Sequence, residues 1–225
     1  MTSRVRTATK EKLIGVRGLS AIATRQQILK AAIEVFSIYG YEGGSTEKIS
    51  KLAKSHDRMI YYYFGSKQGL YIAAIQEIYK RFNEAEAKIK LNIEKPVEAL
   101  EEVARFIWNY YQKHPEFITL LNNENLHRGE MISKSRETKQ NSSPAISVVA
   151  TVLEKSMGIF RQDIVARDIY LLIASMGYFY LSNRYTLSAF LGEKITTKEK
   201  LAHWGSFIDD VVLRTVSLVH QQSKK

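Results

Sequence analysis

The sequence of 225 residues contains no cysteine. Without thiols the chain cannot hold a disulfide framework, a thiolate zinc finger, an iron–sulfur cluster or a thiol nucleophile. This absence fits a reducing, intracellular environment. The five histidines show no metal-ligand spacing, such as two on one helix face four residues apart, so we expect no metal site and no cofactor.

Proline, glycine and long apolar runs are also scarce. Three prolines and twelve glycines, with 45% hydrophobic residues, exclude collagen-like and disordered chains. The most apolar run, 169–181, is shorter than the ~20 residues that a membrane-spanning helix needs, and it contains Ser175 and Gly177. The N-terminus lacks the apolar segment and cleavage site of a secretory signal. We therefore expect a cytoplasmic protein with no membrane partner.

Acidic residues are too few to balance the basic ones, 23 against 33, and the net charge is +10. Most of the excess lies in residues 1–70, which hold 12 basic and 5 acidic residues. Such a charge indicates a polyanionic partner, either nucleic acid or an anionic membrane surface. Residues 1–23 carry several of these cations without a sustained apolar period and predict a flexible basic arm. The arm either contacts the DNA minor groove or phosphates, or only adds solubility.

Helical periodicity runs through the rest of the chain, without strand alternation or a fixed repeat, so the predicted fold class is all-α. The first helix begins at Thr24 and ends at Gly40, its expected C-terminal cap. A long connecting helix, about 67–90, follows Ser66. Residues 128–143 are polar and their structure is less clear. The other expected helices cover 96–113, 116–126, 144 to about 160 with Met157 and Phe160 in its apolar stripe, 164–181 and 197–219.

Residues 45–64 predict two short helices with a break of a few residues between them. This is the layout of a helix-turn-helix, whose second helix enters the major groove of DNA. The second helix covers Asp57–Phe64. On a helical wheel Ile60 and Phe64 turn inward, while Arg58, Met59 and Tyr62 point away and Tyr61 and Tyr63 lie on the flanks. Three consecutive tyrosines cannot all be core, although a packed aromatic patch is the alternative to a DNA-binding face.

The residue types around this second helix suit DNA. Tyrosine hydroxyls can donate to phosphate oxygens, and Ser45, Thr46 and Lys67 offer further phosphate contacts. Arg58 can bind guanine through two hydrogen bonds, and Met59 can contact a thymine methyl group. His56 and Asp57 could also take part. The expected DNA-binding residues are therefore Ser45, Thr46, His56, Asp57, Arg58, Met59, Tyr61, Tyr62, Tyr63 and Lys67.

The segment from Thr24 to Tyr71 resembles the N-terminal domain of the TetR/AcrR family of transcriptional regulators. The matching residues are Ile28, Ala31-Ala32, Phe36, Gly40-Tyr41, Ser45-Thr46, Ile49, Ala53, Tyr61-Tyr62-Tyr63-Phe64, Gly65-Ser66-Lys67 and Leu70. The turn departs from the family pattern, because Lys54-Ser55-His56 replaces glycine, a small apolar residue and serine. The resemblance implies that Ser45, Thr46, Tyr61, Tyr62, Tyr63 and Lys67 contact the DNA backbone, and that residues 56–59 set operator preference.

The resemblance also implies a DNA-binding domain at 24–70 and a helical ligand-binding and dimerisation domain at 71–225. The penultimate helix is apolar on too many sides for a surface helix, and with the final helix it suits a four-helix dimer face. A small-molecule effector would contact inward aromatic residues, each of which could equally be plain core. The candidates are Phe106, Trp108, Tyr110, Tyr111, Phe117 and Tyr178.

The predicted function is a ligand-responsive, sequence-specific regulator, a repressor that binds a palindromic operator as a homodimer. Two alternatives remain at this point. The first is a protein that coats DNA without sequence preference. The second, ranked last, is an enzyme that uses Glu124, Asn125, His127 and Arg128, which could equally form a capped helix end before Gly129.

Overall fold

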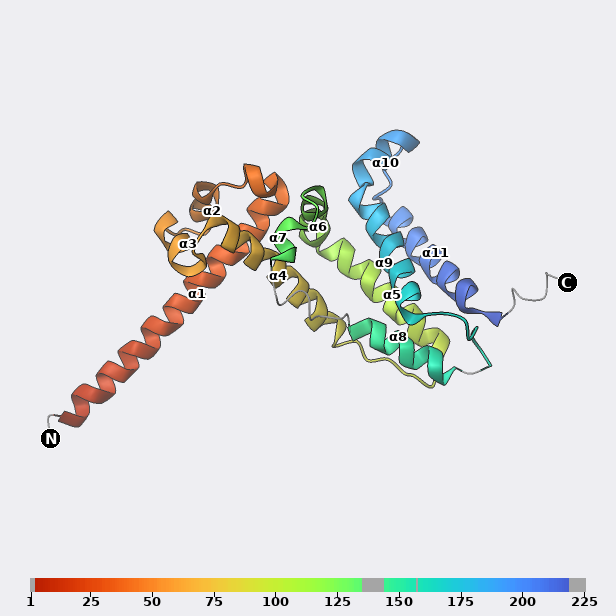
Figure 1. The fold of residues 1–225 in the computed structure, drawn as a ribbon, viewed down its shortest axis with the longest axis horizontal. Coiled ribbons are helices and arrows are strands. Elements are labelled where there is room, and N and C mark those ends of the chain that lie inside the picture. The colour runs from red at the N-terminus through yellow and green to blue at the C-terminus, as the bar shows by residue number, and fades with distance from the viewer. Residues whose placement is uncertain (1–2, 135–143, 157, 219–225) are drawn as a thin grey trace. The chain divides into compact units, whose positions relative to one another are not determined.

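The computed structural model describes residues 3–134, 144–156 and 158–218, and within them the chain is helical (Figure 1). The described part has no β-sheet, only an isolated antiparallel bridge between Phe160 and Ser217, which confirms the all-α prediction. The chain forms two compact units, Met1–Glu77 with Asn123–Thr138 and Ile78–Asn122 with Lys139–Lys225. The expected boundary at residue 70 therefore differs from the observed division, because two later segments pack with the N-terminal helices.

The first unit begins with α1 (Ser3–Gly43), followed by α2 (Thr46–Leu52), α3 (Asp57–Phe64) and the first half of α4 (Lys67–Glu86). The helix α1 starts at Ser3, whereas the sequence predicted a flexible arm over residues 1–23. Residues 4–23 contain no proline and many good helix formers, so intrinsic propensity can extend the packed helix toward the N-terminus.

Buried residues of α1 form the centre of this unit. Ile28, Ala32 and Phe36 are fully buried, and they lie in the stripe that the sequence predicted. Phe36 meets the ring of Tyr71 edge-on, with centroids 5.0 Å apart. Near its end α1 is interrupted at Gly40, whose φ of 67° lies in the left-handed region that favours glycine. Gly40 thus breaks the helix where a cap was expected.

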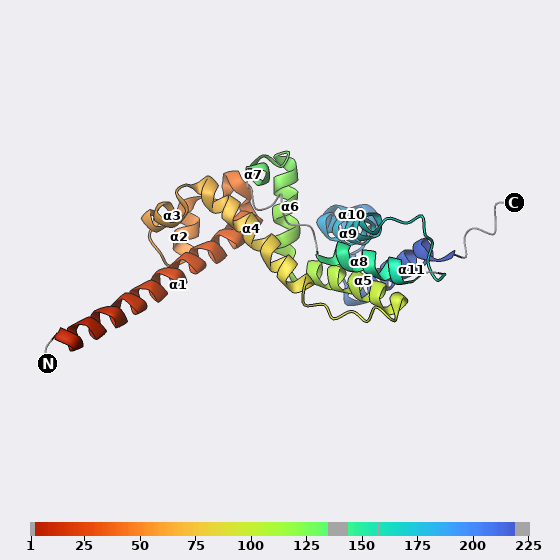
Figure 2. The same cartoon turned by 60° about the horizontal axis from the view of Figure 1, so that its bottom comes forward.

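The second unit contains α5 (Pro96–Lys113), α8 (Pro144–Lys155), α9 (Ala166–Ser182) and α11 (Lys198–Val216), which pack on one another (Figure 2). Their facing sides bury apolar residues at helical spacing, which drives the packing by removing apolar surface from water. The sequence predicted α5 with its observed bounds. Proline fits at the first helical position because a backbone N–H group there would have no acceptor within the helix, so its absence costs no hydrogen bond.

Two stretches of this unit differ from the predicted helices. The helix α8 ends at Lys155, and Phe160, expected in the same stripe, instead lies buried beside Ser217 in the isolated bridge. The helix α10 (Arg184–Leu191) was not predicted; it ends at Gly192, whose φ is 68°. Met157 and residues 135–143 lie outside the described residues.

Two short helices complete the fold, α6 (Pro115–Leu126) and α7 (Glu130–Ser133). The helix α6 begins in the second unit, and its last residues belong to the first unit together with α7. Throughout the described ranges, no helix has both the length and the apolar character that crossing a bilayer requires.

Candidate DNA-binding face and effector pocket

The turn between α2 and α3 holds the two helices in a fixed geometry. The hydroxyl of Ser45 accepts a hydrogen bond from the Lys48 amide (3.2 Å) and caps the start of α2. At the other end, Lys54 adopts φ 49°, in the left-handed region. This is the position where the family pattern has glycine, and here a lysine adopts the left-handed conformation at a conformational cost.

A side-chain contact also ties α2 to α3. The hydroxyl of Ser50 donates to the carboxylate of Asp57, in the first turn of α3. Because this carboxylate is negative and already hydrogen-bonded, its position favours a structural role over contact with DNA. His56, immediately before it, is exposed and forms no side-chain cap.

The helix α3 presents one buried and one exposed face. Ile60 is fully buried, as the helical wheel predicted. Arg58 is exposed, and Tyr61 and Tyr62 keep 53% and 77% of their surface accessible. Met59 is half-buried. Large aromatic side chains this exposed on a short helix form a surface that can contact another molecule.

The remaining candidates lie around this exposed face. Tyr63 is half-buried and packs edge-on against Tyr62, with ring centroids 4.9 Å apart. Ser45 and Thr46 are half-buried at the start of α2. The ammonium of Lys67 donates to the Glu42 carbonyl (3.2 Å) and lies over the ring of Tyr41. Lys67 therefore supports the end of α1 and still has donors for a phosphate.

The region suggested for an enzymatic role is a structural one. Glu124 is buried, and its Oε1 accepts hydrogen bonds from the amides of Met131 (2.8 Å) and Ile132 (2.7 Å) at the start of α7. His127 bonds the Asn123 carbonyl through Nδ1 (2.7 Å). These contacts are those of a capped helix end, the non-catalytic alternative that the sequence left open.

Residues beside Glu124 also contact the core of the first unit. The amide of Asn123 donates to the Phe36 carbonyl (3.4 Å), just before the break at Gly40. Burial, together with the charge of nearby Glu124, raises the pKa of the Tyr71 hydroxyl. The end of α6 is thus bound to α1 and lies close to Tyr71 of α4 within this unit.

Most of the aromatic residues predicted to bind a ligand instead pack around Phe82. Its ring lies within 6.2 Å of four of them by centroid distance: Phe106, Tyr110, Tyr111 and Phe117. Burial raises the pKa of Tyr110 to about 12. Trp108 donates to the Leu201 carbonyl (3.2 Å), and Tyr178 to the side chain of Asn122. Most of these residues therefore pack as core residues, which was the alternative to ligand binding in the sequence analysis.

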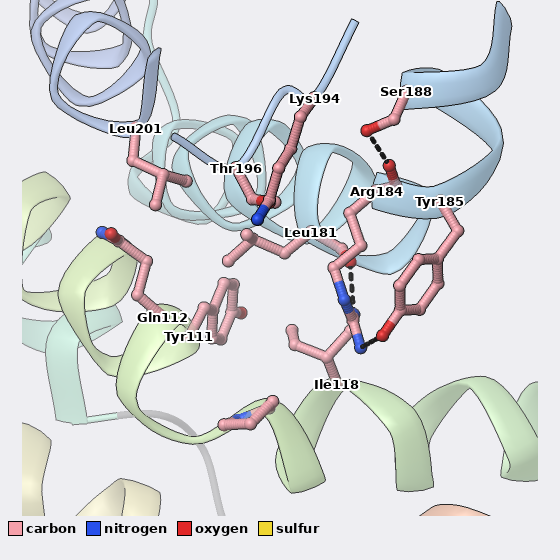
Figure 3. A pocket seen from close by; sticks show the side chains of 11 residues that line it. Tyr111, Gln112, Ile118, Leu181, Arg184, Tyr185, Ser188, Lys194, Thr196 and Leu201 are labelled. Atoms are coloured by element: carbon pink, nitrogen blue, oxygen red, sulfur yellow. Dashed lines mark hydrogen bonds between the residues drawn. The ribbon is translucent and has the colours of Figure 1, made fainter. Parts of the chain in front are cut away.

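A cavity of about 580 Å³ lies elsewhere in the second unit (Figure 3). Of the six predicted aromatics, only Tyr111 lines it. Trp108 and Phe106 border two other cavities, of about 410 and 450 Å³. The described residues that line the largest of the three are Tyr111, Gln112, Pro115, Ile118, Leu181, Arg184, Tyr185, Ser188, Lys194, Thr196 and Leu201. Ten of these residues were not predicted to bind a ligand. They come from five helices and a loop, and no pattern in the sequence indicates that these segments meet.

Comparison with known proteins identifies two stretches of the chain. Residues 28–74 match the family described as bacterial regulatory proteins, tetR family, and residues 96–212 match the tetracyclin repressor-like C-terminal domain. This chain belongs to the TetR family. It is 50% identical over 202 residues to the HTH-type transcriptional repressor NicS of Pseudomonas putida, covering 89% of this chain and 95% of that protein.

More distant relatives resemble shorter or less similar stretches of this chain. The regulator RutR of Escherichia coli is 39% identical over 67 residues, 30% of this chain and 32% of RutR. A TetR-like regulator from Rhodococcus has the same fold, with a TM-score of 0.59 at 24% identity over 85% of this chain and 94% of its own. Membership confirms the predicted class, a DNA-binding transcriptional regulator rather than an enzyme.

Proposed function

We propose that this TetR-family regulator is a homodimeric repressor that binds a palindromic operator and changes its DNA affinity when a small molecule binds the second unit. The observation that carries the proposal is the exposed face of α3, where Arg58, Tyr61 and Tyr62 point away from a helix anchored by buried Ile60. The 50% identity of this chain to a protein named as a transcriptional repressor supports repression over activation.

The proposed contacts divide by chemistry. Arg58 reads a base edge in the major groove, because its planar guanidinium can donate two hydrogen bonds to guanine. Met59 contributes an apolar contact, and exposed His56 lies at the start of the same helix. Tyr61, Tyr62, Tyr63, Ser45, Thr46 and Lys67 hold the phosphate backbone and so fix the register of the helix.

A second copy of the chain is the proposed partner in the dimer. Leu171 and Phe179 on α9, Phe207 on α11, and Phe190 and Leu191 on α10 are large apolar side chains left exposed in one chain, Phe190 by 85%. Exposed apolar surface of this extent marks an interaction site. An isologous interface of these helices would place two α3 helices for a two-fold symmetric operator.

Coupling between effector and DNA needs an element that responds to both. The helices α4 and α6 are each continuous and contribute residues to both units. Ile118 of α6 lines the cavity in the second unit. Asn123 and Glu124 of the same helix form hydrogen bonds within the first unit. An effector that favours one arrangement of these helices shifts DNA affinity by its differential affinity for the two states, typically ~1–3 kcal/mol.

The test is selection of bound sequences from a random DNA pool by the full chain at a fixed salt concentration, since salt alone changes affinity strongly. The expected product is an inverted repeat with half-sites about one helical turn apart, ~34–36 Å or a multiple. A pool that stays random despite binding would contradict the proposal and favour the coating protein. If the protein bound no DNA from the pool, that result would also contradict the proposal.

A further inference from the structure

We propose that the cavity beside α10 binds a small organic acid: Arg184 and Lys194 hold its carboxylate, and the apolar walls hold its body. The inference rests on the proposed function, because it names the ligand class of that regulator. It starts from the lining. Among the described residues that line this cavity there are two cations and no carboxylate.

The cations have no anionic partner in the described part of the chain. One N–H of Arg184 donates to the Leu181 carbonyl (2.7 Å) and another donates to the Tyr185 hydroxyl (3.4 Å), both neutral groups. The nearest acidic residue in sequence, Glu193, pairs with Lys200 instead. A positive charge with only neutral partners favours an anion that enters the cavity.

Arg184 is also held in place before any ligand arrives. Its guanidinium lies over the ring of Tyr185, 4.5 Å from the centroid, in addition to its bond to the end of α9. Its own carbonyl accepts a hydrogen bond from Ser188 (2.6 Å). A guanidinium fixed in this way loses little side-chain entropy on binding, and its planar fork matches a carboxylate.

The rest of the lining selects the body of the ligand. In Figure 3 the side chains of Arg184 and Lys194 extend from α10 and the segment after it toward the space bordered by Tyr111, Ile118 and Leu181. These three walls are aromatic or aliphatic. Gln112 and Thr196 add neutral hydrogen-bonding groups. A volume of about 580 Å³ suits a small organic molecule.

A carboxylate fits this lining better than a phosphate ester. Two cations can balance either the single charge of a carboxylate or the two charges of a phosphate monoester. The choice rests on the remaining wall, most of which is apolar and suits an acid with a hydrocarbon or aromatic body. Phosphate sites typically add several backbone N–H donors. The same cations could nevertheless hold a phosphate, so the experiment includes one.

The experiment is calorimetric titration of the full chain with matched probes: benzoate against benzamide, hexanoate against hexanamide, and phenyl phosphate. We expect at least one acid to bind, with its amide at least about tenfold weaker, because the amide lacks the charge-assisted hydrogen bonds. Binding of acid and amide with equal affinity, preference for phenyl phosphate, or no saturable binding of any acid up to about 10 mM would overturn the inference.

Variants locate the binding site. Arg184→Gln and Lys194→Gln should each weaken the acid at least about fivefold and leave the amide unchanged. Lys194 is exposed and forms no structural bond in the described chain, so Lys194→Gln stays informative even if Arg184→Gln fails to fold. Arg214→Gln is the matched control, since Arg214 is exposed and its ion pair within the described part of the chain is with Asp210. The assignment would be contradicted if Arg214→Gln lost as much affinity for the acid as the cavity variants. It would also be contradicted if Lys194→Gln and a folded Arg184→Gln lost none.

DNA binding, measured separately with and without the acid, distinguishes this inference from the proposed function. Acid binding that requires Arg184 and Lys194 supports the pocket even if the protein selects no operator, in which case the proposed function fails alone. An operator that is selected and released by a compound whose binding ignores both cations overturns the pocket and leaves the function in place.

Discussion

In the first unit the exposed side chains proposed to enter the DNA groove lie on one short helix, whereas in the second unit the cavity lining is gathered from six segments of the chain. The exposed face of α3 consists of Arg58, Tyr61 and Tyr62 within five consecutive residues. The cavity instead takes Tyr111 from α5 and Lys194 from the segment after α10. The difference reflects shape, because a groove of DNA is read by a convex surface and a small ligand needs a concave one.

The two units also differ in how their polar residues are used. Around α3, Ser50 and Asp57 bond each other and set the turn, which leaves the outward residues available. In the second unit, polar groups such as Arg184 and Tyr185 both support the fold and line the cavity. Substitutions in the first unit can therefore separate DNA binding from folding more cleanly than substitutions in the cavity.

The largest expected effect tests whether the second unit depends on its own core. Trp108 is buried against Gly177 and Gly205 and donates to the Leu201 carbonyl. Trp108→Ala should lower the free energy of unfolding by about 3–5 kcal/mol, through the cavity left behind. Denaturant unfolding followed by the fluorescence of Trp204 measures this. Asn109→Ala, at the exposed neighbour, should change little, and a similar loss in both would contradict the packing described.

The next effect concerns the end of α6. Glu124→Gln replaces a buried carboxylate that accepts two amide hydrogen bonds, so we expect a loss of about 1–2 kcal/mol of stability. Hydrogen exchange at the Met131 and Ile132 amides should become faster. Glu130→Gln serves as the control, because Glu130 is exposed and pairs with Lys134. Unchanged exchange in Glu124→Gln would show that α7 is held in some other way.

A smaller effect tests the backbone contacts of α3. Tyr61→Phe removes one exposed hydroxyl and keeps the ring, so affinity should fall about three- to tenfold for every DNA sequence, the value of one hydrogen bond. Fluorescence anisotropy with operator and unrelated DNA measures this ratio. Tyr39→Phe, on α1 with similar exposure, should bind as the wild type does. A loss confined to the operator would instead assign Tyr61 to base reading.

The smallest effect has the opposite sign. Lys54→Gly relieves the left-handed backbone at φ 49°, and we expect stability to stay equal or to rise by up to about 1 kcal/mol, because the gain is offset in part by greater freedom of the unfolded chain. Thermal unfolding compares it with Lys51→Gly, which lies inside α2 and should lose about 1 kcal/mol. Destabilisation of both variants to the same extent would contradict the strain at Lys54.

The sequence predicted local structure better than the cavity. It placed α3 and α5 at their observed bounds and Ile60 on the buried face, since periodicity and helix-ending residues are local signals. Local signals also misled, because Phe160 continued the stripe of α8 although the chain leaves the helix before it. Arg184 lay outside every helix that the sequence predicted, and only tertiary packing brings it beside Tyr111 and Lys194.

The central claim is that the exposed face of α3 reads DNA sequence, and Arg58 tests it most directly. The measurement compares wild type and Arg58→Ala on the selected operator and on all of its single-base variants at one salt concentration. We predict that Arg58→Ala loses preference at one base pair in each half-site, by about 1–3 kcal/mol, with little change on unrelated DNA. Equal loss on every sequence would contradict the claim and reduce Arg58 to a phosphate contact.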